Sequence, residues 1–293
     1  MNSLPGWIED KEAVSEIASG LDFPTFSTTG AFSLESVPTE VFGWKLHESL
    51  VGGVWPSRDQ GQVGSCVSFG TCAAIEFTML AEISRLEPEA YKPLVQEVVY
   101  GGSRVEIGKG RISGDGSVGA WAAKFVTNYG VVSRGIYGKN DLSVYNESRC
   151  REYGRVGVPD DLEVEARKHP INSITLVESA DQAVKALASG YGISICSNQG
   201  FTKQRDKNGF AAPQGRWGHC MAAIGYQLGE RPGIWICNSW GERYHTGPVG
   251  NGNPPVCGFW ADMEIVDKML GLGDSWAFSS FLGFPKKMID WKI

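Results

Sequence analysis

The sequence predicts an α+β protein, because helical periodicity dominates its first half and short apolar runs dominate its second half. A helix beginning near Ser65 is predicted by an apolar stripe at helical spacing, formed by Phe69, Ala73, Phe77 and Leu80. Three short apolar runs bounded by glycines and polar loops are typical of buried strands, at residues 193–196, 220–226 and 234–237.

Two further helices are predicted from their start and stop signals. One spans residues 119–129 and ends at Gly130, where glycine favours a left-handed cap. The other opens at Ser179 or Asp181 and runs to Gly190.

Two segments are predicted to be irregular. Residues 1–50 are expected to form an extended, wrapping arm, because prolines interrupt any long periodic run at Pro5, Pro24 and Pro38. Residues 247–258 are rich in glycine, proline and asparagine and predict a surface loop.

The composition is that of a soluble globular protein. With 293 residues the chain has room for one large or two small domains, and 42% hydrophobic with 20% charged residues is ordinary for such chains. No apolar run approaches the roughly 20 residues of a membrane span, and the N-terminus does not resemble a secretory signal. We therefore expect a cytoplasmic protein. A net charge of −6 without a basic block gives no reason to expect nucleic-acid or membrane binding.

The seven cysteines and four histidines predict neither a disulfide framework nor a metal site. The cysteines are sparse and odd in number, no CxxC pair occurs, and the histidines are scattered. No metal and no cofactor is expected, and most cysteines are expected to be small buried side chains in a reducing compartment. Cys220 and Cys237 flank a proposed hairpin, so their pairing is a separate hypothesis; it requires a Cα separation of about 4.4 to 6.8 Å.

Cys66 is the first candidate for chemistry. A glycine-containing loop, residues 59–64, delivers it into the first turn of the predicted helix. The unpaired N–H groups and positive dipole of a helix N-terminus favour a thiolate and lower the pKa of a cysteine there. Cys66 is therefore predicted to be a nucleophile, although an isolated cysteine at such a junction is more often a packing residue.

His219 and Asn238 supply the complementary groups. His219 opens an apolar strand, and Asn238 follows nineteen residues later, as expected if a hairpin returns the amide beside the imidazole. An amide oxygen at that point accepts the imidazole N–H and fixes the tautomer of the ring.

These segments resemble the papain family of cysteine peptidases. The matching runs are Gln60-Gly61 with Gly64-Ser65-Cys66, Gly218-His219 leading to Gly225-Tyr226, and Asn238-Ser239-Trp240-Gly241, in the family's order. The resemblance implies Cys66 as nucleophile, His219 as general base and acid, Asn238 as its orienting partner and Gln60 as an oxyanion donor. It also implies that Trp240 shields the histidine–asparagine hydrogen bond from water.

A fourth match concerns substrate binding. Residues 114–121 resemble the family's glycine-containing strand, on which the substrate backbone pairs. Gly116 keeps one of two adjacent glycines, and Ser117 or Asp115 stands where the other would be. We take Gly116, Ser117 and Ser65 as the substrate-binding candidates.

The resemblance implies two lobes with the active-site cleft between them. The expected division is an arm at 1–58 that partly joins the strand-rich lobe, a helical lobe at 59–165, and a strand-rich, barrel-like lobe at 166–293. The chain departs from the family at Val63, Val67 and Tyr244-His245, the last of which replaces a second Trp-Gly pair. The short N-terminal region suggests a propeptide-poor member of bacterial or phage type.

Three functions follow from these residues. The first is hydrolysis of polypeptide substrates through a thioester acyl-enzyme. The second is a papain-fold structural or assembly component, with protein partners, of a larger particle such as a phage virion. The third is amide hydrolysis or acyl transfer on a substrate other than protein. Retention of all four chemical types, Gln60, Cys66, His219 and Asn238, favours the first function.

Overall fold

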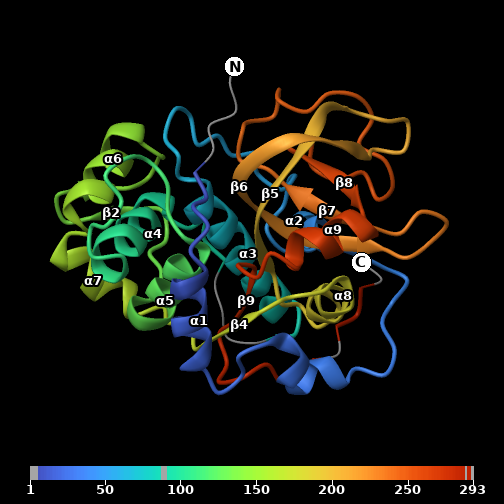
Figure 1. Ribbon diagram of the computed structural model, residues 1–293, viewed down its shortest axis with the longest axis horizontal. Coiled ribbons are helices and arrows are strands. Elements are labelled where there is room, and N and C mark those ends of the chain that lie inside the picture. The colour runs from blue at the N-terminus through green and yellow to red at the C-terminus, as the bar shows by residue number, and fades with distance from the viewer. Residues whose placement is uncertain (1–5, 87–90, 288, 292–293) are drawn as a thin grey trace.

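The computed structural model describes residues 6–86, 91–287 and 289–291. Two lobes lie on either side of one long helix, α3 (Cys66–Ile83), with helices on one side and a large antiparallel sheet on the other (Figure 1). This is the mixed α+β, two-lobe arrangement predicted from the sequence.

The helical lobe contains most of the chain between α3 and residue 166. Its elements are α4 (Gln96–Gly102), a π-helical turn η3 (Ser103–Ile107), α5 (Gly119–Tyr129), the two-strand hairpin β2 (Ile136–Tyr137) and β3 (Asn140–Asp141), α6 (Glu147–Val156) and α7 (Asp160–Ala166). Helix α5 ends where the sequence predicts, because Gly130 follows with a φ of +88°.

The strand-rich lobe is one seven-stranded sheet in the order β4-β9-β5-β6-β7-β8, with β1 paired to β6. Its strands are β1 (Glu40–Phe42), β4 (Ser173–Leu176), β5 (Ile193–Arg205), β6 (Ala211–Gln227), β7 (Gly233–Cys237), β8 (Gly258–Asp262) and β9 (Trp276–Ser279). A bridge between Phe210 and Trp260 connects β8 back to the start of β6, which gives the sheet its barrel-like closure. Helices α2 (Gly43–Leu50), α8 (Ala180–Ala188) and α9 (Met263–Leu270) pack around this sheet.

Helix α3 is the shared core of both lobes. It is long and apolar enough by composition to cross a membrane, yet 94% of its 18 residues are buried inside the fold. Its buried Glu76 is paired with Arg58 at 2.5 Å and accepts the Leu94 N–H at 2.7 Å. We therefore attribute its hydropathy to packing against the sheet and the helical lobe.

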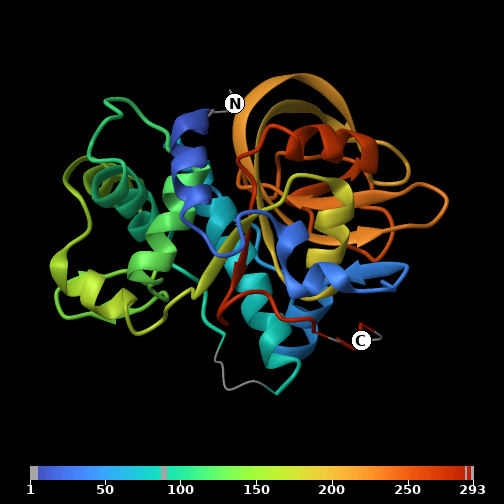
Figure 2. The ribbon, with the colours of Figure 1, turned by 60° about the horizontal axis from the view of Figure 1, so that its bottom comes forward.

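The N-terminal arm is more structured than the sequence predicts. Instead of one extended segment it contains α1 (Lys11–Ser19), two short 3-10 turns, β1 and α2. Helix α1 forms between the prolines, and the side chain of Asp10 caps it by accepting the Ala13 N–H at 2.9 Å. The arm touches both lobes, since α1 packs on α5 while β1 pairs with β6 (Figure 2).

Candidate active site

Cys66 is the first residue of α3 and is completely buried. Burial raises the pKa of its thiol above that of an ordinary thiol, although the backbone N–H groups of Cys220, Val67 and Gly6 act in the opposite direction. The predicted lowering of this pKa is therefore wrong for this conformation, because loss of solvent outweighs the three N–H donors.

His219 lies on β6, directly before the residue whose N–H contacts the Cys66 thiol. Its Nε2 is 2.8 Å from Oδ1 of Asn238, as the predicted hairpin requires. Burial lowers the pKa of His219 to about 4, although the hydrogen bond to Asn238 acts in the opposite direction. Its Nδ1 is buried and has no hydrogen-bond partner among the described residues.

Trp240 covers the His219 ring. The two rings are stacked with centroids 4.2 Å apart and an angle of 24° between their planes. Trp217 and Tyr244 meet Trp240 edge-on at 4.7 and 4.6 Å, so the indole is itself held in place. This is the position that a shielding tryptophan would occupy.

Gln60 is buried beside the same residues. Its Oε1 accepts the Ser239 hydroxyl at 2.7 Å, and one N–H of its Nε2 donates to the Val63 carbonyl at 2.8 Å. An amide nitrogen carries two N–H groups, so one donor remains for a ligand.

The substrate-strand candidates meet the N-terminal segment of the chain, since Ser117 donates its N–H to the Gly6 carbonyl at 2.8 Å. Ser117 bonds its hydroxyl to Ser103 at 2.8 Å, which leaves only its backbone for strand pairing. Gly116 has a φ of +116°, and its carbonyl accepts from the guanidinium of Arg104 while its N–H donates to the Tyr100 hydroxyl at 3.1 Å. The side chain of Ser65 is buried against Tyr145, at 3.3 Å, so no side-chain contact to a substrate is available to it here.

The protein's own N-terminal segment, residues 6–8, lies between the substrate-strand candidate Ser117 and Gly218, the residue before His219. Ser117 donates its N–H to the Gly6 carbonyl at 2.8 Å and accepts the Ile8 N–H at 2.9 Å. The Gly218 carbonyl accepts the N–H groups of Gly6 and Trp7 at 2.8 and 2.9 Å. Position 6 must be glycine, because a Cβ there would lie 2.3 Å from the Gly64 carbonyl oxygen.

Trp7 anchors this segment. Its side chain is 6% exposed, and its indole N–H donates to Oδ2 of Asp274 at 2.7 Å. Asp274 also accepts the Gly119 N–H at 2.9 Å and the Trp276 indole N–H at 2.8 Å. Burial raises the pKa of Asp274 to about 6, against the effect of these donors.

The hypothesised pairing of Cys220 with Cys237 is wrong in this structure. All seven cysteines are free, and the sulfur of Cys237 lies 3.5 Å from that of Cys257 instead. Cys220 pairs with Cys196 across β5 and β6. Its side chain lies on the face of the sheet toward α3, where its sulfur is close to Gly70.

The site contains three further residues, Arg104, Asp274 and His245. The sequence patterns did not identify them as site residues. Arg104 donates to four backbone carbonyls, those of Ile112, Gly114, Gly116 and Gly154, and so fixes the substrate strand. Only the departure at Tyr244-His245 gave a sequence signal. Arg104 and Asp274 act through contacts between distant segments and had no local pattern.

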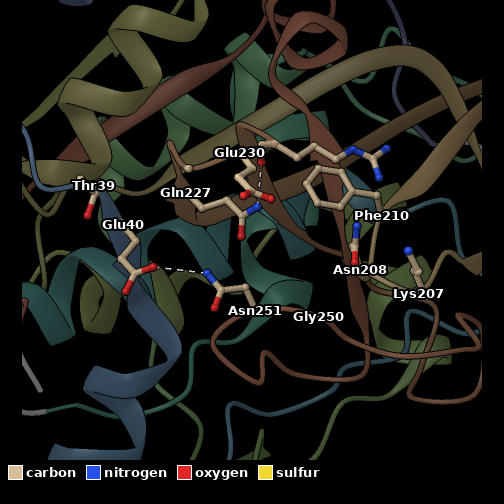
Figure 3. A pocket seen from close by; sticks show the side chains of 11 residues that line it. Thr39, Glu40, Lys207, Asn208, Phe210, Gln227, Glu230, Gly250 and Asn251 are labelled. Atoms are coloured by element: carbon tan, nitrogen blue, oxygen red, sulfur yellow. Dashed lines mark hydrogen bonds between the residues drawn. The ribbon is translucent and has the colours of Figure 1, made fainter.

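A surface pocket lies away from this site. It has a volume of about 560 Å³ and is lined near β1 and the β6–β7 turn by a mixture of charges that includes Glu40, Lys207, Glu230 and Arg231 (Figure 3). Glu40 is bonded across it to Asn251 at 3.2 Å. None of the residues of the candidate active site lines it. Within the described part of the chain, no group of three or more His, Cys, Asp or Glu side chains is placed to hold a metal ion.

Comparison with known proteins agrees with this geometry. The family model described as papain family cysteine protease matches residues 39–248, more than half of the chain. This chain belongs to the papain family of cysteine proteases.

Individual relatives are distant. Cysteine proteinase 1 of Entamoeba histolytica is 25% identical over 224 residues, which is 72% of this chain and 64% of the relative, so the match spans less than two thirds of that relative's length. Among solved structures, xylellain, a cysteine protease from Xylella fastidiosa, superimposes with a TM-score of 0.62 at 18% identity, covering 95% of this chain and 97% of its own. The bromelain protease from Ananas comosus, in complex with the E64 inhibitor, gives a TM-score of 0.51 at 18% identity, covering 83% and 99%.

Proposed function

We propose that this chain is a cysteine peptidase that hydrolyses peptide bonds through a thioester acyl-enzyme, with Cys66 as nucleophile and His219 as general base and acid. The observation that carries the proposal is the 2.8 Å hydrogen bond from His219 to Asn238, with His219 on a strand that packs against the helix whose first residue is Cys66. A protein that used this fold only as a scaffold would not need these groups in this order.

The proposed reaction begins when Nδ1 of His219 takes the proton of the Cys66 thiol, and the sulfur attacks the carbonyl carbon of the substrate. The oxyanion accepts hydrogen bonds from the Cys66 backbone N–H and the free N–H of Gln60. His219 then gives its proton to the leaving amine, and a thioester remains. Water, deprotonated by His219, attacks the thioester and releases the acid and the free thiol.

The segment of residues 6–8 indicates how a substrate binds. It uses the N–H and carbonyl of Ser117 and the carbonyl of Gly218, which are the backbone groups that an extended peptide would use. In this conformation the cleft is closed to substrate, so we propose that the segment must be displaced before hydrolysis. The subsite that holds the Trp7 side chain then accepts a large substrate side chain.

The test is labelling with an electrophilic peptidyl epoxide of the E-64 type, followed by peptide mapping. We expect modification at Cys66, its loss in Cys66→Ser, and unchanged labelling in Cys150→Ser, a matched change at another buried cysteine. A cleavage assay on a peptide library then identifies the substrate. An unlabelled Cys66 in a folded protein whose cleft has been opened by Trp7→Ala would contradict the proposal and favour the assembly function.

A further inference from the structure

His245 lies behind the candidate catalytic pair, on the side of Asn238 that faces away from His219. It is 3% exposed, and its ring packs against Phe259 and Tyr244 with centroids 4.8 and 4.9 Å away. Its Nε2 is 3.1 Å from Nδ2 of Asn238. His245 stands where the sequence departs from the second Trp-Gly pair of the papain signature.

The direction of each hydrogen bond among His219, Asn238 and His245 can be worked out from one group that can only donate. The backbone N–H of Ser239 can only donate, and it lies 2.7 Å from the side-chain atom of Asn238 that also contacts His219. That atom must therefore be the oxygen. His219 must donate to it from Nε2, which leaves the lone pair of His219 on Nδ1.

The other side of the amide is then fixed as well. Nδ2 of Asn238 carries only protons, so the atom it meets must be an acceptor. Nε2 of His245 can accept only if the ring is neutral and its proton is on Nδ1. Burial and the neighbouring charge of Arg205 lower the pKa of His245 to about 3, in agreement with a neutral ring.

From this geometry we infer that His245 is a positioning residue for the reaction. It accepts the amide N–H of Asn238, so that the amide oxygen is held toward His219 and the basic nitrogen of His219 is held toward Cys66. The inference rests on the proposed function of His219, but the arrangement His219–Asn238–His245 can be measured without any turnover.

A phenylalanine at this position would keep the packing and remove the acceptor. Asn238 is only 3% exposed, so its N–H would then be buried without a partner, and the amide would be free to rotate toward another acceptor. Ser239 would remain as the sole fixed donor to the oxygen. The ring of His219 would lose its single orientation, whereas a substrate would still find its backbone partners.

The kinetic test compares His245→Phe with His245→Gln, whose Oε1 replaces the acceptor. We expect His245→Phe to lower kcat about 10-fold with KM nearly unchanged, and His245→Gln to regain most of the loss. His47→Phe is the matched control, because His47 is 7% exposed, packs against Trp55 and Tyr91, and lies outside the site. Loss of kcat in both His245 variants alike, or in neither, would overturn the inference.

The second test is independent of activity. In the Cys66→Ala protein with nitrogen-15 histidine, NMR should show His219 protonated at Nε2 and His245 protonated at Nδ1. Exchange of the His219 ring proton with water should become about 10-fold faster in His245→Phe and stay slow in His245→Gln. Protonation of His245 at Nε2, or exchange unaffected by His245→Phe, would refute the positioning role even if the protein is a peptidase. If no substrate is ever found, these spectra still decide it.

Discussion

Replacing Trp7 by alanine should open the cleft and expose Cys66. Trp7 is almost completely buried, and its indole donates to the carboxylate of Asp274 at 2.7 Å. Truncating a buried tryptophan to alanine costs about 3 to 5 kcal/mol. If closure of the segment depends on this side chain, the open state gains that free energy relative to the closed state. At 1.4 kcal/mol per factor of ten, the open population rises about 100- to several-thousand-fold.

Alkylation of Cys66 by iodoacetamide at pH 8 measures this population, because the thiol is completely buried in the closed state. Labelling should accelerate in Trp7→Ala until the open state predominates. Trp7→Phe keeps most of the packing and loses only the hydrogen bond to a charged group, about 1.5 to 3 kcal/mol, so it should give an intermediate rate. Cys150, also buried, reports any general loosening of the fold in the same sample.

The reasoning would be refuted if Cys66 in Trp7→Ala were labelled no faster than in the wild type while the protein stayed folded. Acceleration at Cys66 and Cys150 together would also refute it, since it would mean unfolding and not release of the segment. Peptide mapping of both cysteines separates these results.

Four further predictions follow from the site. Arg104→Lys should raise KM about 10-fold with a smaller change in kcat, because one ammonium cannot hold several carbonyls of the substrate strand; steady-state kinetics measures this. Trp240→Ala should lower kcat roughly 10-fold by admitting water to the His219 ring, with Trp240→Phe less affected; equal kcat in all three proteins would remove the shielding role. Burial lowers the pKa of His219 to about 4 from 6.5. Between pH 6.5 and about 4, His219 binds a proton in the unfolded chain but not in the folded one. The free energy of unfolding therefore falls by about 1.4 kcal/mol for each pH unit by which the pH drops. A urea series from pH 7 to 4 should show a smaller slope in His219→Gln. Thiol titration of the unfolded protein should find seven free thiols, and peroxide should join Cys237 to Cys257 in preference to any other pair; a different first pair in mass spectrometry would contradict the structure.

The sequence predicted what depends on local pattern. Helix α3 follows from an apolar stripe, and α5 ends at Gly130 because a residue with positive φ is required there. The pairing of His219 with Asn238 followed from two strands and their separation. These features need only short-range chemistry and one hairpin.

Features that depend on distant contacts were not predicted. The arm was expected to be extended, yet α1 forms because it is capped by Asp10 and packs on α5. The raised pKa of Cys66 comes from its burial in the folded chain, so a helix dipole alone gave the wrong direction. Asp274 is one carboxylate in an apolar stretch, and only the fold brings it to Trp7.

If residues 6–8 close the site as proposed, their covalent attachment to the chain makes the site selective for tightly binding ligands. A segment on the same chain competes at a fixed effective concentration, so diluting the protein does not weaken it. The apparent affinity of any ligand equals its affinity for the open state multiplied by the fraction of molecules that are open. If opening costs about 3 kcal/mol, a peptide must overcome a weakening of about 150-fold, and weak ligands present at ordinary concentrations never gain access. Under the proposed function, a tethered glycine and tryptophan thus set the affinity that a substrate must exceed before it can reach Cys66.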